Sequence, residues 1–155
     1  MSANIVDPAL LSAKSVSDIS YLQKFAVNFE FPVVFTEDLF SPANATLRDT
    51  VCRLEPDKRH RCLFFVDQGL LSAHPDLIDR IKTYAARNSA NIELVAEPIV
   101  VPGGEKIKSN LHFVEDLQRQ LYEHHIDRHS YAIAIGGGAV LDAVGLVAAT
   151  THRGV

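Results

Sequence analysis

The sequence feature that most constrains the fold is residues 131–142, which read Tyr-Ala-Ile-Ala-Ile-Gly-Gly-Gly-Ala-Val-Leu-Asp. A short apolar run typical of a buried strand leads into three glycines, and a segment of small residues with helical character comes next. Glycines let a ligand approach the backbone closely, and the free N–H groups and dipole at the start of a helix favour an anion. The stretch therefore predicts a strand-to-helix corner that can hold a phosphate group, with Asp142 in the first turn of the helix.

The rest of the chain predicts strands that alternate with helices. Apolar runs at residues 61–67 and 92–101 are typical of buried strands, although Pro98 interrupts the second run. Apolar residues at helical spacing predict helices over residues 41–55, 75–88 and 105–125. This alternation predicts an α/β fold, a Rossmann-like parallel sheet with helices on both faces in three layers.

The amino-terminal part of the chain carries less information. Residues 1–24 predict a loose arm or one short helix, to which we assign no function. Residues 25–35 alternate partly between apolar and other residues, and they predict an edge strand because Pro32 cannot donate a ladder hydrogen bond. No linker or repeat divides residues 25–155, so we expect them to form one domain.

Composition excludes several kinds of partner. The net charge of -4 provides no basic face for a nucleic acid, and no apolar run approaches the roughly 20 residues that a membrane span needs. Cys52 and Cys62 do not form a Cys-x-x-Cys pair, and the amino terminus lacks the pattern of a signal peptide. We therefore expect a cytoplasmic protein that binds a small molecule. The chain stops just after an Arg-Gly pair, so we also expect it to be the front part of a longer protein.

Three groups of residues come after the predicted strands, where ligands bind in open parallel sheets. They are Asp67 after the first strand, residues 103–108 after the second, and residues 136–138 with Asp142 after the third. Taken singly, each also has a structural interpretation: a tight turn, a carboxylate that complements a helix dipole, or solvated charges at a helix start. The dinucleotide fingerprint Gly-x-Gly-x-x-Gly is incomplete, because Leu141 stands where its last glycine would be.

Taken together and in order, these elements resemble the 3-dehydroquinate synthase family and its sugar-phosphate cyclase relatives. The family pattern Gly-Gly-Gly-x-x-x-Asp matches residues 136–142, and its later Arg-Gly pair matches Arg153 and Gly154. Residues 102–108 resemble its Gly-Glu-x-x-Lys element, and Asp67 matches its earlier aspartate. The resemblance covers roughly residues 62–155.

The resemblance implies a Rossmann-like amino-terminal domain that binds NAD. By position, Asp67, Glu105 and Lys108 would contact the riboses and neighbouring groups, and Gly136, Gly137, Gly138 and Asp142 would surround the pyrophosphate. Arg153 would bind the substrate phosphate, for which a guanidinium fork is well suited, whereas Thr150 and Thr151 would satisfy backbone groups at the helix end.

The resemblance also implies the chemistry of the complete enzyme, a phosphate-eliminating lyase. NAD would oxidise one carbinol of a heptulosonate-type or heptulose-type phosphate, phosphate would leave, the carbonyl would be reduced again and the product would close into a carbocycle. A divalent metal, zinc or cobalt, would bind in a downstream helical domain, so the present chain would be inactive alone. A homodimer is also implied.

Several alternatives remain. Leu141 and His152 depart from the housekeeping enzymes, which points to a specialised cyclase of secondary metabolism. The same glycine corner occurs in metal-dependent alcohol dehydrogenases, and a non-catalytic nucleotide-binding or dimerisation module would also use this fold. His124, His125 and His129 lie close together, but adjacent histidines point to different sides of a helix and no zinc-type spacing accompanies them.

Overall fold

The computed structural model describes residues 20–28, 30–104, 111–152 and 154–155. The chain forms two compact units, Met1–Pro32 and Val33–Val155, and every described helix and strand belongs to the second. The predicted features at residues 1–19, 105–110 and 153 lie outside the described residues.

A parallel sheet is built around one central strand, β1 (His60–Asp67). On one side β1 pairs with β4 (Tyr131–Ile135), in a register that joins Cys62 to Tyr131 and Val66 to Ile135. On its other side the beginning of β1 pairs with β2 (Ile92–Leu94) and its end pairs with β3 (Ile99–Val101). All three pairings are parallel, and the carboxyl ends of β1, β3 and β4 lie together at one edge of the sheet.

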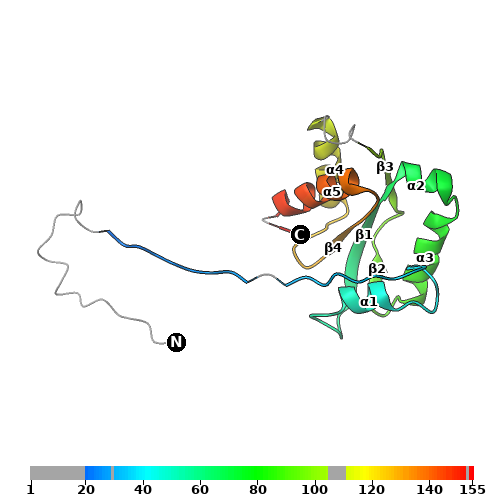
Figure 1. Cartoon of the computed structure of the whole chain (residues 1–155), viewed down its shortest axis with the longest axis horizontal. Helices are drawn as coiled ribbons and strands as arrows, with labels where there is room; N and C mark the ends of the chain where they lie inside the picture. The colour runs from blue at the N-terminus through cyan, green and yellow to red at the C-terminus, as the bar shows by residue number, and fades with distance from the viewer. Residues whose placement is uncertain (1–19, 29, 105–110, 153) are drawn as a thin grey trace, which may run out of the picture. The chain divides into compact units, whose positions relative to one another are not determined.

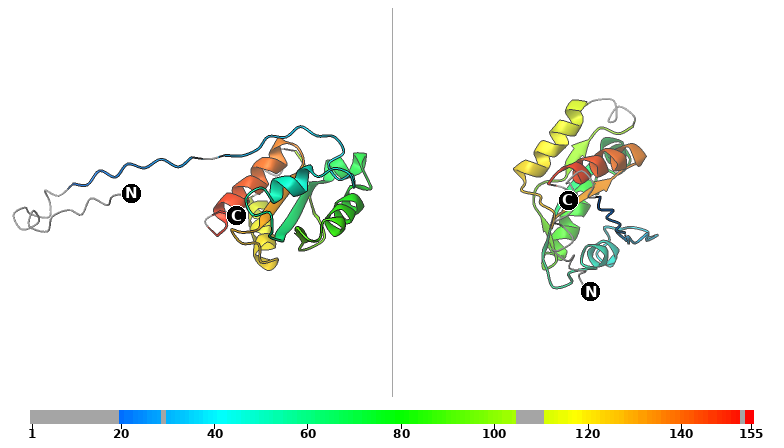
Figure 2. Two further views of the ribbon diagram at one scale, coloured as in Figure 1. Left: turned by 90° about the horizontal axis from the view of Figure 1, so that it is seen from below. Right: turned by 90° about the vertical axis from the view of Figure 1, so that its left-hand side faces the viewer.

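Helices cover both faces of this sheet (Figures 1 and 2). Because side chains alternate along a strand, Leu63 and Phe65 enter one core cluster with residues of α4 (Leu111–Glu123) and α5 (Gly138–Thr150). Phe64 and Val66 enter a second cluster with α1 (Thr46–Val51) and α3 (Leu77–Arg87). The predicted α/β fold with helices on both faces is confirmed.

The strand predicted over residues 92–101 is in fact two strands. β2 ends at Leu94 and β3 begins at Ile99, and Pro98 lies in the gap. Proline has no N–H to donate, so a central ladder cannot run through it without a break. The two short strands still follow β1 from its beginning to its end.

Three local predictions were wrong. The structure assigns no strand to the described part of residues 25–35, where Phe25, Phe31 and Phe35 are all exposed. The helix predicted from residue 41 begins only at Thr46, because residues 41–43 form a turn closed by the Asn44 N–H and the Ser41 carbonyl. The structural interpretation of Asp67 as a turn-forming residue is wrong as well, because the residues after it form a short helix, α2 (Gln68–Ala73).

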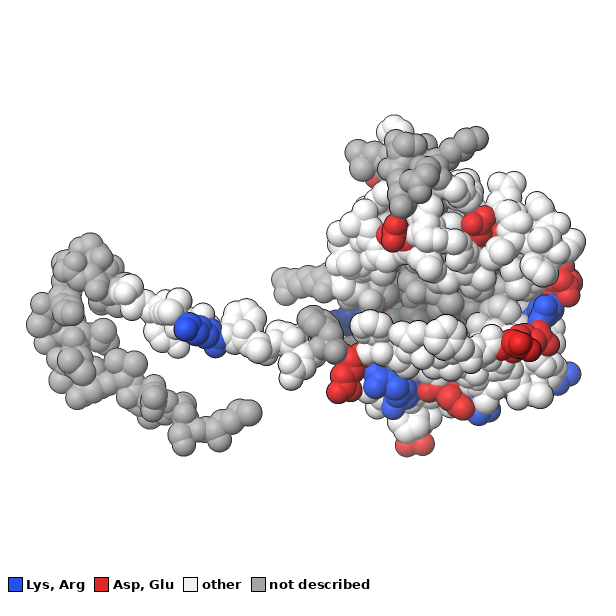
Figure 3. Space-filling model, viewed as in Figure 1, with Lys and Arg blue, Asp and Glu red and all other residues white. Residues whose placement is uncertain are grey.

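Charge is mixed on one face of the described molecule. Figure 3 shows Lys and Arg side chains interspersed with Asp and Glu on the face that it presents. Exposed ion pairs such as Lys82–Glu97, at 2.7 Å, account for part of this mixing. None of the described helices is both long and apolar enough to cross a membrane.

Candidate functional site at the carboxyl ends of the strands

Three loops converge where the parallel strands end. Asp67 closes β1 and lies opposite Val101, the last residue of β3, while Ile135 at the end of β4 lies opposite Val66. Residues 102–104 therefore leave the sheet on one side of Asp67, and residues 136–138 leave it on the other. The sheet thus brings together, at one edge, Asp67, the described glycines of residues 103–108 and the glycines of residues 136–138.

Asp67 lies between the glycines of these loops. Its Oδ1 accepts a hydrogen bond of 2.7 Å from the Gly69 N–H, so the side chain caps the start of α2. A Cβ at Gly103 would lie 2.3 Å from Oδ1 of Asp67, and a Cβ at Gly136 would lie 2.9 Å from the Asp67 Cβ. A side chain at position 136 would meet the Cβ atoms of Asp67 and Val140, whereas one at position 103 would require the Asp67 carboxylate to shift.

The next two glycines face open space. A Cβ added at Gly137 or Gly138 would meet nothing within 4 Å. Gly137 is the N-cap of α5, and its carbonyl accepts from the N–H groups of Val140 and Leu141 at 3.0 and 3.1 Å. The N–H groups that precede Val140 at the start of α5 have no carbonyl to pair with inside the helix, so a helix of this length presents them and its positive dipole end to an anion.

An open hollow adjoins this corner on the other side of Asp67. It is lined by Asp67, Gln68, Gly69, Ser72, Gly103 and Gly104. The contributions of α2 to it were missed at the sequence level. An aspartate at the end of an apolar run, with a glycine two residues later, is the signal that could have indicated a helix cap there.

Leu141 and Asp142 both lie on the surface of α5. Asp142 is the fifth residue of the helix rather than part of its first turn, which contains no acidic residue. Leu141 is 49% exposed, whereas Val140 beside it is fully buried in the core. A glycine at position 141 is therefore not needed for close packing between helix and sheet.

Three predicted site residues, Glu105, Lys108 and Arg153, lie outside the described residues. The glycine directly after Arg153 is described, and its φ of 110° favours glycine on steric grounds. The Thr150 and Thr151 hydroxyls donate to backbone carbonyls of Leu146 and Val147 at 2.8 and 2.7 Å. Their predicted role at the end of the helix is confirmed.

The histidines after α4 form its C-terminal cap. His125 has a φ of 50°, and its N–H donates to the carbonyl of Tyr122 at 3.0 Å. The Ile126 N–H donates to Leu121 at 2.8 Å, which completes a Schellman motif. Within the part of the chain that the structure describes, no group of three or more His, Cys, Asp or Glu residues could hold a metal ion.

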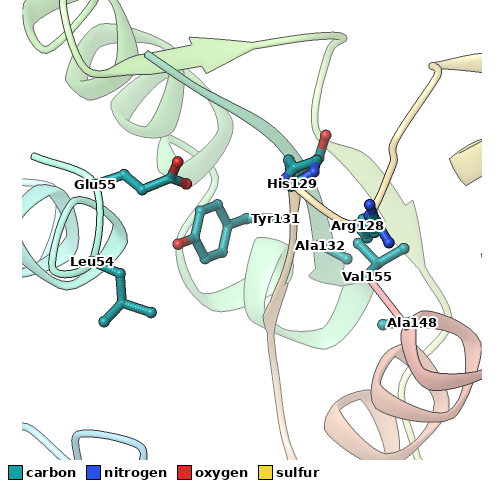
Figure 4. Close-up of a pocket in the computed structure, with 9 residues that line it drawn as sticks. Leu54, Glu55, Arg128, His129, Tyr131, Ala132, Ala148 and Val155 are labelled. Carbon is teal, nitrogen blue, oxygen red and sulfur yellow. The ribbon is translucent and has the colours of Figure 1, made fainter. Parts of the chain in front are cut away.

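A separate pocket lies at the opposite, amino-terminal end of β4 (Figure 4). Glu55, Arg128, His129 and Tyr131 contribute its polar groups. The Tyr131 hydroxyl donates to the Val51 carbonyl at 2.9 Å, and burial raises the pKa of this phenol. The tyrosine thus ties β4 to α1, and the pocket is remote from the edge where the glycine loops meet.

Comparison with known proteins bears on the same region. Residues 98–155 match the family model described as 3-dehydroquinate synthase N-terminal. The 3-dehydroquinate synthase of Macrococcus caseolyticus (strain JCSC5402) is 44% identical over 57 residues, which are 37% of this chain and 16% of that protein. The enzyme of Staphylococcus aureus (strain JH9) is 33% identical over 99 residues, 64% of this chain and 25% of that protein. The chain thus spans a quarter or less of the length of these relatives.

Among solved structures, a 2-deoxy-scyllo-inosose synthase complexed with carbaglucose-6-phosphate, NAD+ and Co2+ matches with a TM-score of 0.48 and 22% identity. The match covers 70% of this chain and 28% of that one. A second structure of a 2-deoxy-scyllo-inosose synthase matches with a TM-score of 0.47 and 24% identity, over 70% of this chain and 29% of that one.

Proposed function

Since residues 98–155 match an amino-terminal segment of the 3-dehydroquinate synthase family, we propose that this chain is the NAD-binding part of a sugar-phosphate cyclase. The complete enzyme would convert a heptulosonate-type or heptulose-type phosphate into a carbocycle with elimination of phosphate. The observation that carries the proposal is the open corner at Gly137 and Gly138, which lies inside the matched segment.

The residues at this corner fit a dinucleotide pyrophosphate. Gly137 and Gly138 leave room for a phosphate group against the backbone, and the first turn of α5 offers N–H donors. We assign Gly136 to the shape of the turn, because its missing side chain accommodates Asp67 and Val140. Asp142 lies one turn further along the helix and would border the pyrophosphate from there.

The remaining roles rest on position in the sequence. Glu105 and Lys108 would bind the riboses and neighbouring groups, and Arg153 would bind the substrate phosphate through its guanidinium fork. Asp67 lines the open hollow, and from there it would border the ribose. When bound, NAD supplies the acceptor and later the donor of a hydride, and this chain supplies its binding and orientation.

The part of the chain that the structure describes offers no site for a divalent metal. The described residues contain no group of three or more metal-ligating side chains, so we derive no step that depends on a metal here. We propose that zinc or cobalt binds elsewhere in the complete enzyme and polarises the carbinol.

Calorimetric titration with NAD tests the proposed site. In the complete protein we expect binding by the wild type, and a loss of affinity of about tenfold or more in Gly137→Ala, because the added methyl group fills the space left for the phosphate. Gly145→Ala is the matched control, since a Cβ there meets nothing within 4 Å and lies outside the corner. A complete protein with no NAD affinity would refute the proposal.

Two alternatives predict different results. A metal-dependent alcohol dehydrogenase would accumulate NADH with a simple alcohol, whereas a cyclase returns NAD unchanged. A non-catalytic module would keep its function when Gly137 is replaced. The matched family segment favours the cyclase over both.

We further propose a homodimer in the cytoplasm that binds neither nucleic acid nor membrane. The free, buried thiols of Cys52 and Cys62 support a reducing compartment. Light scattering of the complete protein tests the dimer, and a monomeric mass at micromolar concentration would contradict it.

A further inference from the structure

The position of Asp67 suggests a role beyond contact with a ribose. Among the residues at the carboxyl edge of the sheet, its side chain approaches the loops after all three strands. It accepts from the Gly69 N–H at 2.7 Å, it occupies the place of a Cβ at Gly103, and it adjoins Gly136. Since β1 is the central strand, this side chain lies between the two flanking loops.

We propose that Asp67 is a positioning residue that sets the spacing of the glycine loops around the cofactor. The inference rests on the proposed NAD site, and it accounts for the close contacts that an added Cβ would make at two separate glycines. At Gly103 the conflict is with the carboxylate itself, because an added Cβ would lie 2.3, 2.7 and 2.8 Å from its Oδ1, Oδ2 and Cγ atoms.

The requirement at Gly103 does not come from its backbone. The glycines with positive φ are Gly104 and Gly154, so the backbone at position 103 lies outside the left-handed region and accepts an L-residue. What an added side chain at position 103 would meet is the Asp67 carboxylate. If the carboxylate were removed, an alanine at position 103 would gain the space that it needs.

This reciprocity gives a double-mutant cycle. In the complete protein, Gly103→Ala alone and Asp67→Ala alone should each weaken NAD binding about fivefold or more, because either change displaces a loop. The double variant Asp67→Ala/Gly103→Ala should bind no worse than Asp67→Ala. Effects that simply multiply would overturn the proposal.

A second variant separates the shape of the Asp67 side chain from its charge. Asp67→Asn keeps the shape of the side chain and an oxygen that accepts from Gly69, but it has no negative charge. In urea unfolding of the complete protein, we expect Gly103→Ala to lower the free energy of unfolding as much in the Asp67→Asn background as in the wild type, because asparagine occupies the same space. An asparagine background that tolerates Gly103→Ala as well as the Asp67→Ala background does would overturn the positioning role.

Urea unfolding of the wild type, Asp67→Ala, Gly103→Ala and the double variant distinguishes this inference from the proposed function. The coupling between positions 67 and 103 should appear in the free energy of unfolding without any ligand. Non-additive unfolding together with no NAD binding by the wild type would refute the proposed function alone. Additive unfolding would refute the positioning role whether or not NAD binds.

Discussion

At the residue scale, Gly136 has a structural role that the neighbouring glycines lack. A Cβ at this position would lie 2.9 Å from the Cβ of Asp67 and 3.0 Å from that of Val140, which is fully buried. We expect Gly136→Ala to lower the free energy of unfolding by about 1–3 kcal/mol, because neither neighbour can move without disturbing the core. Urea denaturation measures the change.

Gly145→Ala is the control for this prediction. Gly145 lies inside α5, and an added Cβ meets nothing within 4 Å. Alanine is the better helix former by about 0.5–1 kcal/mol, so this variant should be as stable as the wild type or more stable. Equal stability of the two variants would contradict the role that we give to Gly136.

Cys62 should make the stability of the protein depend on pH. Burial raises the pKa of its thiol from 9.0 to about 12. The unfolded chain therefore loses this proton at lower pH than the native chain does. The stabilisation is complete below pH 9 and decreases as the pH rises from 9 towards 12.

A comparison of urea unfolding at about pH 8 and about pH 10.5 tests this dependence. The wild type should lose more stability between the two pH values than Cys62→Ala, which has no thiol at this position. The alanine variant is less stable at both pH values because of its cavity, so the difference between pH values is the relevant quantity. An equal loss in both proteins would contradict the assignment to Cys62.

At the scale of the elements, the cap of α4 is not optimal. His125 adopts a φ of 50° at the position where a Schellman motif prefers glycine. We expect His125→Gly to raise the free energy of unfolding by about 0.5–1 kcal/mol, since the left-handed conformation costs a residue with a Cβ more than it costs glycine. A thermal unfolding scan would show the rise. His124→Gly, one residue earlier, should be neutral or destabilising, and a larger gain there would contradict the prediction.

The elements that the sequence predicted well are those with a strong local pattern. The apolar run of β1 and the helical spacing of α3 predicted both elements to within two residues, because burial on the two faces of the sheet requires those patterns. Pro98 indicated an interruption in the strand predicted over residues 92–101, but the sequence did not show that the strand would divide into two. Whether a proline ends a strand or divides it depends on the neighbouring strand, and β1 continues past the gap.

Predictions that depend on distant residues could not be made in the same way. The partial alternation of residues 25–35 matches a strand, yet a strand also needs an edge to pair with, and the structure gives the described part of this segment none. The convergence of Asp67 with the glycine loops followed from the rule for parallel sheets. The close approach of the Asp67 carboxylate to Gly103 could not be predicted from that rule, because it depends on the position of one side chain.

At the scale of the whole molecule, the chain contains one side of the proposed catalytic machinery. It spans a quarter or less of the length of its 3-dehydroquinate synthase relatives, and its described residues lack a metal-ligating group. The open corner at α5 is the proposed site of the dinucleotide, but orientation of the cofactor alone does not eliminate phosphate from a substrate. We therefore expect these 155 residues to release no phosphate from a heptulosonate phosphate.

A phosphate-release assay with NAD and added Co²⁺ checks this expectation, with the complete protein as the positive control. The complete protein should release phosphate from the substrate. Gly137→Ala in the complete protein should lower the rate of release at subsaturating NAD, because Gly137 lies at the proposed cofactor site. The isolated chain could release phosphate at a rate above the background measured without protein. If Gly137→Ala abolished that release, the release would depend on the proposed cofactor site and would refute the expectation. The catalytic groups would then have to lie within residues 1–155, and the search for them would begin at Glu105, Lys108 and Arg153.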